Sequence, residues 1–262
     1  MQTIRSDERS ILQRAAPILA VICQVGSTFL PALGFGEQIG ERSDSVRTLI
    51  TPSGWAFSIW GPLFLGCLIF AIWQALPAQR FNALLNRICW PASIALAAQG
   101  VWAAYTQFNN LTVVSAIIIF VSLIGLLMVL RTLVKHTEFT AKERWLVALV
   151  FSSLAAWLTA ASIVNVSATL RYIGVSGEMT YPLVTAAMVA IGGVIAALAT
   201  VRSRGNPWYA LVFCWALTAI YFRGGQEEGM IALACIASGL LVALAALIGI
   251  ANPHNRRHWL GI

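Results

Sequence analysis

The sequence has few charged residues and lacks any long polar stretch. Asp, Glu, Lys and Arg make up only 10% of its 262 residues, whereas soluble domains carry roughly 25%. These charges fall in short segments between long apolar runs. A run of about 20 apolar residues is long enough to cross the ~30 Å hydrocarbon core of a bilayer. The distribution excludes a water-soluble domain and predicts a polytopic membrane protein.

The apolar runs also lack the alternation that is typical of transmembrane β-strands, so the spanning elements are expected to be helices. The first run is interrupted by Pro17 and Gln24 and has no clear cleavage site, which favours a retained helix over a signal peptide. We predict an all-α bundle of about eight transmembrane helices, near residues 15–35, 55–76, 88–107, 111–130, 145–167, 181–201, 207–222 and 229–251.

Basic residues are divided unevenly between the two sides that eight spans define. One side receives 13 of the 17 Lys and Arg residues, namely Arg5, Arg9, Arg14, Arg80, Arg87, Arg131, Lys135, Lys142, Arg144, Arg202, Arg204, Arg256 and Arg257. The other side receives Arg42, Arg47, Arg171 and Arg223. The positive-inside rule places the richer side, with both termini, in the cytoplasm. This topological excess explains the formal charge of +7 without nucleic acid as a partner.

Several kinds of chemical site are missing from the sequence. The five cysteines form no CxxC motif, so we interpret them as apolar packing residues. His136, His254 and His258 lie in basic segments without a carboxylate pattern, so no metal site is expected. No nucleophile–base pair is visible, and no ionisable residue lies in the middle of a span. We therefore expect no catalytic residues and no resident cofactor, and ion-coupled transport becomes less favoured.

Tryptophan is abundant, with ten residues, and some of them lie deep in the predicted spans beside amides. Gln99 and Trp102 share one face of the third span, and Asn109 follows at its end. Trp157 and Asn165 share one face of the fifth. A buried amide needs a partner, and for any single residue an interhelical hydrogen bond explains it slightly better than a ligand does. Together, however, these aromatic and amide faces favour a pocket.

The second span opens with Pro52, Trp55 and Phe57, followed by the run WGPLF at residues 60–64. This pattern resembles the second helix of the TspO/MBR family, the tryptophan-rich sensory or translocator proteins, which have five membrane helices. The order of Gln, Trp and Asn in the third span resembles that family's third helix. The fifth span repeats the family's interval of eight residues between a Trp and an Asn.

The chain departs from that family's pattern in its fifth span and in its length. Ser153 and Leu154 stand where the family has a proline and a tyrosine. The family's five-helix chain ends about where residue 170 falls here. We therefore expect a TspO/MBR-like membrane domain over residues 1–170 and a C-terminal three-helix extension with a short basic tail over residues 171–262.

The resemblance implies an integral protein of the bacterial cytoplasmic (inner) membrane that binds a hydrophobic, planar small molecule. Porphyrins and other tetrapyrroles are the leading candidates, and homodimers are also implied. Photo-oxidative porphyrin breakdown at Trp157 follows from the resemblance alone, and an enzyme is not the expectation. The alternative function is a small-molecule permease or exporter, although buried charge and internal repeats are missing. The expected ligand-binding residues are Trp60, Gln99, Trp102, Asn109, Trp157 and Asn165.

Overall fold

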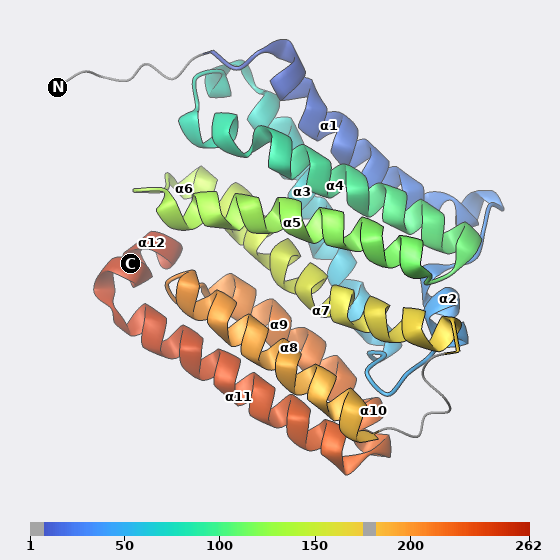
Figure 1. Ribbon diagram of the computed structural model, residues 1–262. Helices are drawn as coiled ribbons and strands as arrows, with labels where there is room; N and C mark the ends of the chain where they lie inside the picture. The colour runs from blue at the N-terminus through green and yellow to red at the C-terminus, as the bar shows by residue number, and fades with distance from the viewer. Residues whose placement is uncertain (1–7, 175–181) are drawn as a thin grey trace.

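A computed structural model describes residues 8–174 and 182–262, which are almost entirely helical and contain no strand. Eight long helices pack side by side in one bundle (Figure 1). They are α1 (Ile11–Gly26), α3 (Trp60–Ala75), α4 (Ala83–Asn109), α5 (Val113–Lys135), α7 (Leu149–Tyr172), α8 (Pro182–Arg202), α9 (Pro207–Tyr221) and α11 (Gly229–Ala251). The short helices are α2 (Ile39–Ser45), α6 (Ala141–Glu143), α10 (Gly224–Glu227) and α12 (Pro253–Leu260). The predicted all-α polytopic bundle is confirmed.

Six helical segments of the described chain are long and apolar enough to cross a bilayer. They contain α1, α3, α5, α7, α8 and α11. The other two long helices correspond to predicted spans but do not meet that criterion, because α9 has only 15 residues and α4 carries several amides. Both pack among the spanning helices, α4 against α1 and α5, and α9 against α7 and α11. A count of eight spans therefore stays a prediction.

The first helix differs from the predicted span over residues 15–35. It begins at Ile11, because Ser10 and Gln13 form a capping box there. It ends at Gly26, and the chain then turns through short 3₁₀ segments at Ser27–Phe29 and Pro31–Leu33. Pro31 has no backbone N–H to continue a helix. The predicted bounds were wrong at both ends, because the helical segment that is long enough to span a bilayer covers Ile11–Phe29.

The connections around α3 and α4 follow from local chemistry. A 3₁₀ segment, Gly54–Ile59, precedes α3, and Pro62 lies in the first turn of α3, where a missing N–H costs no helical hydrogen bond. A tight hairpin joins α4, which ends at Asn109, to α5, which begins at Val113. Asn110 turns the chain with a φ of 71°, and the Thr112 side chain caps α5.

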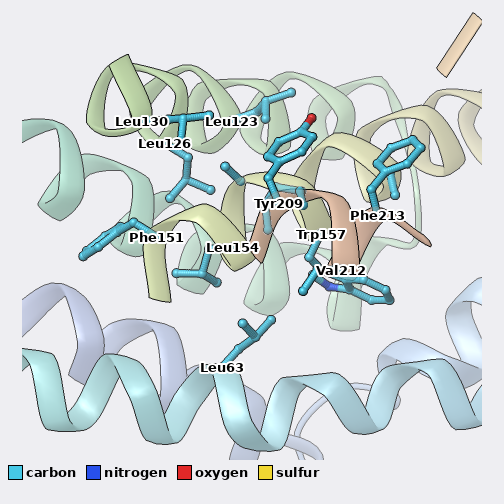
Figure 2. Packing of buried hydrophobic residues seen from close by; sticks show 14 of the residues in the cluster. Leu63, Leu123, Leu126, Leu130, Phe151, Leu154, Trp157, Tyr209, Val212 and Phe213 are labelled. Carbon is cyan, nitrogen blue, oxygen red and sulfur yellow. The ribbon is translucent and has the colours of Figure 1, made fainter. Parts of the chain in front are cut away.

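The last three helices share their core with the first five. Tyr209 on α9 donates a hydrogen bond to Thr159 on α7 over 3.0 Å. Figure 2 shows Leu154 and Trp157 of α7 among side chains of α5 and α9. Within the C-terminal part, α8 packs against α11, and a Cβ at Gly193 would overlap Ser238. Small residues such as Gly193 allow this close approach of two helices within the chain.

Polar contacts join separate segments at both ends of the bundle. At the end where α2 and α10 lie, Arg223 pairs with Asp44 over 2.7 Å and Arg47 pairs with Glu227. The start of α1 and the C-terminal helix α12 lie at the opposite end (Figure 1). There the indole N–H of Trp259 donates to the Ser203 carbonyl over 2.9 Å. This hydrogen bond joins α12 to the residue after the end of α8.

Candidate functional site

A cavity of about 550 Å³ lies between α1, α3 and α4, at the end of the bundle where α2 is placed. This volume falls within the range of about 300–1,000 Å³ that is typical of small-molecule sites. The loop that follows α1 and the helix α2 complete its wall through residues between 28 and 44. The aromatic side chains that line it are Phe57, Trp60, Phe64 and Trp102.

One connected cluster contains three of these rings, Phe57, Trp60 and Phe64, together with Trp157 on α7. Trp60 and Phe64 are four residues apart on α3 and therefore share a face. Their ring centroids are 5.0 Å apart in a stacked arrangement. Trp157 on α7 meets Trp60 edge-on at 6.0 Å and Phe57 edge-on at 6.3 Å. The cluster gives the cavity flat apolar surfaces that are held in place by packing from a second helix.

A buried pair of amides forms the opposite part of the wall. Gln24 on α1 donates from Nε2 to Oε1 of Gln99 on α4 over 2.7 Å, and both side chains are buried. Gln107, which lies eight residues after Gln99 on α4, donates to the Ser27 carbonyl over 3.1 Å. These bonds fix α1 and its following loop against α4. They also leave amide groups at the cavity surface, where they can orient a bound molecule.

A second, smaller cavity of about 50 Å³ adjoins the first, because Phe57 and Trp102 line both. Trp157 and Asn165 also line it. Asn165 accepts a hydrogen bond from Ser115 over 3.1 Å. Within the described residues, however, its Nδ2 and the indole N–H groups of Trp102 and Trp157 are buried without a partner. Buried donors without acceptors are costly, so these three N–H groups favour a ligand that carries acceptor atoms.

One charged pair borders the larger cavity. Arg223, just after α9, donates to Asp44 over 2.7 Å and to the Pro52 carbonyl over 3.1 Å. Arg223 and Asp44 both line the cavity. Because Asp44 compensates the guanidinium of Arg223, this border of the cavity is polar but carries no net charge from the pair.

The structure brings together five of the six residues predicted from the sequence. Trp60, Gln99 and Trp102 line the larger cavity. Trp102, together with Trp157 and Asn165, lines the smaller one. Asn109 lies apart from both, at the exposed end of α4, where its side chain donates to the Tyr105 carbonyl over 3.2 Å.

Sequence reasoning missed several lining residues. Gln24 carried a usable signal, since it interrupts an apolar run in the same way as Asn165 does. Phe64 also carried one, four residues after Trp60 on the same helix face. Asp44 and Arg223 come from separate connecting segments. Their pairing depends on the tertiary fold, and no local pattern indicates it.

The bundle and its aromatic cavity define the class of protein: an integral membrane protein built of packed helices around a small-molecule-sized pocket. The family model described as TSPO-like protein matches residues 10–248. The chain therefore belongs to the TSPO-like protein family. The match extends through most of α11, so it includes the helices beyond residue 170. No curated protein and no solved structure matches the chain.

Proposed function

We propose that the protein binds a hydrophobic, planar ligand such as a porphyrin in the aromatic cavity. The observation that carries this proposal is the cavity of about 550 Å³ bordered by Trp60, Phe64 and Trp102. Flat rings bind planar molecules by offset stacking and edge-on contacts, and burial of their apolar area supplies most of the affinity. The cavity lies between helices of a membrane protein, so a lipophilic molecule bound there would be surrounded by apolar side chains.

The polar groups of the site complement such a ligand. The indole N–H of Trp102 is a buried donor between the two cavities and suits an acceptor atom of the ligand. The indole N–H of Trp157 and the Nδ2 of Asn165 are further buried donors at the adjoining smaller cavity. A few donors placed around aromatic walls fix orientation, whereas the walls supply affinity.

Titration of the purified, detergent-solubilised protein with protoporphyrin IX tests this proposal through quenching of tryptophan fluorescence. We expect saturable binding in the wild type. Trp102→Phe removes a buried donor and Trp60→Leu removes a flat ring from the wall of this cavity. A hydrogen bond or an aromatic contact contributes about 0.5–1.5 kcal/mol, so each variant should weaken binding roughly two- to tenfold.

Two matched variants serve as controls for this titration. Asn109→Ala removes an amide that lies outside the cavity, and Trp90→Phe removes an exposed indole. Both should leave the affinity unchanged. If no saturable binding occurs, or if all four variants bind alike, the aromatic cavity is not a porphyrin site and the permease function becomes the better hypothesis.

We also propose that the protein lies in the bacterial cytoplasmic membrane with both termini in the cytoplasm. One support is that α12 and the start of α1 lie at the same end of the bundle (Figure 1). The other is that the segments predicted on that side carry 13 of the 17 basic residues. Single cysteines placed in a variant without native cysteines would test it. A cysteine at Lys142 should react with membrane-impermeant maleimide only after lysis, and one at Glu41 should react in intact cells with a permeabilised outer membrane. The reverse result would contradict the orientation.

A further inference from the structure

A separate cavity of about 520 Å³ lies among α5, α7, α8 and α9. It shares no lining residue with the aromatic cavity or with the smaller cavity beside it. The C-terminal ends of α5 and α8 reach it with Lys135 and Arg202, so it lies towards the basic end of the bundle. The function proposed above makes no use of it.

The long wall of this cavity is aliphatic and partly open to the bilayer. Leu123 and Leu130 of α5 are buried behind it, and Figure 2 shows Tyr209 beside them. Leu127 on α5 and Leu198 on α8 are 41% and 48% exposed. In a membrane these exposed side chains face lipid, so a hydrocarbon chain has lateral access to the cavity.

The polar groups in the floor of the cavity are already satisfied by the protein. Tyr209 donates to Thr159 over 3.0 Å, and Thr159 donates to the Ala155 carbonyl over 2.7 Å. Ser203 donates to the Ala199 carbonyl over 2.7 Å. Since all three hydroxyl groups already donate hydrogen bonds within the protein, the floor of the cavity needs no polar ligand group and can contact an apolar acyl chain.

The charged end of the cavity is uniformly cationic. Arg131, Lys135 and Arg202 line it, all three are exposed, and no acidic residue lines it with them. Over the ranges 8–174 and 182–262, none of the three takes part in an ion pair. Lys135 and Arg202 lie in the last turns of α5 and α8, where the helix dipole favours a cation. Three like charges around one opening nevertheless repel one another. An anionic group between them would relieve this repulsion.

We propose that this cavity holds one anionic glycerophospholipid. Its phosphate lies among Arg131, Lys135 and Arg202, and an acyl chain extends along Leu127 and Leu198. Basic pockets between helices at the cytoplasmic end of a membrane protein suit such headgroups. A free phosphate would use only the charged opening and would leave the aliphatic wall uncovered. Because the lipid would contact α5 on one side and α8 on the other, it would also join the C-terminal helices to the rest of the bundle.

Native mass spectrometry of the delipidated full-length protein tests this proposal with defined lipids. Phosphatidylglycerol and phosphatidylcholine with identical acyl chains are added in turn, together with a thermal unfolding measurement. We expect one phosphatidylglycerol to bind with at least roughly tenfold preference and to raise the unfolding temperature. The variant Arg131→Gln/Lys135→Gln/Arg202→Gln should lose this preference. Arg80→Gln/Arg87→Gln/Lys142→Gln removes three exposed charges outside the cavity and should retain it.

A second variant keeps the test decisive if the triple replacement fails to fold. Ala199→Phe places a ring in the cavity while all three cations remain, so it should also weaken phosphatidylglycerol binding at least severalfold. Equal binding of the two lipids, or equal loss in the control triple variant, would overturn the proposal. Complete displacement of phosphatidylglycerol by millimolar inorganic phosphate would overturn it too, since the site would then recognise phosphate alone.

Discussion

Gly100→Ala is expected to destabilise the protein and to abolish tight ligand binding in the aromatic cavity. Gly100 lies on α4 against α1, and a Cβ there would come within 2.6 Å of the carbonyl carbon, the carbonyl oxygen and Sγ of Cys23. Two of these atoms belong to the backbone, so no rotation of a side chain relieves the overlap. Overpacking of this kind costs about 1–3 kcal/mol, and more where a whole helix must move.

The same displacement reaches the site, because the two contacting residues are neighbours of the amide pair. Gln24 follows Cys23 on α1, and Gln99 precedes Gly100 on α4. A shift of α1 away from α4 would separate the two amides, which are now 2.7 Å apart, and would open the wall of the cavity. Protoporphyrin IX titration and thermal unfolding in detergent measure the two effects together. We expect at least about tenfold weaker binding, which corresponds to ~1.4 kcal/mol.

Gly61→Ala is the matched control for this prediction. Gly61 lies in the first turn of α3, and a Cβ there meets nothing within 4 Å. Alanine stabilises a helix by roughly 0.5–1 kcal/mol relative to glycine. The control should therefore be neutral or slightly stabilising, with unchanged binding. If Gly100→Ala behaves in the same way as Gly61→Ala, the close approach of α1 and α4 does not govern stability or binding.

The parts of the fold that the sequence predicted well are those set by long-range hydrophobic pattern and helix register. The eighth predicted span, 229–251, coincides with α11, which runs between Glu228, its N-cap, and Asn252. Trp157 and Asn165 lie on the same cavity because eight residues bring a helix back to nearly the same face. Apolar length and periodicity are local properties, so a single sequence contains them.

The parts that could not be predicted depend on contacts between distant segments. The loop after α1 turns inward over the cavity, and its Gly36 lies close to Gln107 of α4. Asn109 was predicted as a site residue because the order of Gln99, Trp102 and Asn109 resembles that of the family's third helix. In the structure, α4 ends at this residue and Asn110 adopts a positive φ, so the amide of Asn109 points out of the bundle end. Such turns are set by tertiary packing rather than by the periodicity of the flanking helices.

Acidification from pH 6.5 to about pH 4 is expected to weaken the attachment of α12 to the bundle through His258. This ring is buried, with its centroid 4.7 Å from that of Phe139. Burial, aided by the positive charge of Arg204, lowers the pKa of His258 from 6.5 to about 4. A detached α12 would expose the ring and restore its ordinary pKa. Below pH 6.5 the detached state therefore binds a proton that the docked state does not, and docking loses stability as the pH falls.

The expected loss is about 2 kcal/mol near pH 4, after an allowance for solvent screening at the bilayer edge, and it vanishes above pH 6.5, where the ring is neutral in both states. Hydrogen exchange of the α12 amides, corrected for the intrinsic rate, should show about 30-fold lower protection at pH 4 than at pH 7. His258→Phe should remove this dependence. His254→Asn, on the exposed face of the same helix, should retain it. Equal pH dependence in His258→Phe and the wild type would assign the effect to another group, because the phenylalanine variant has no proton to gain at this position.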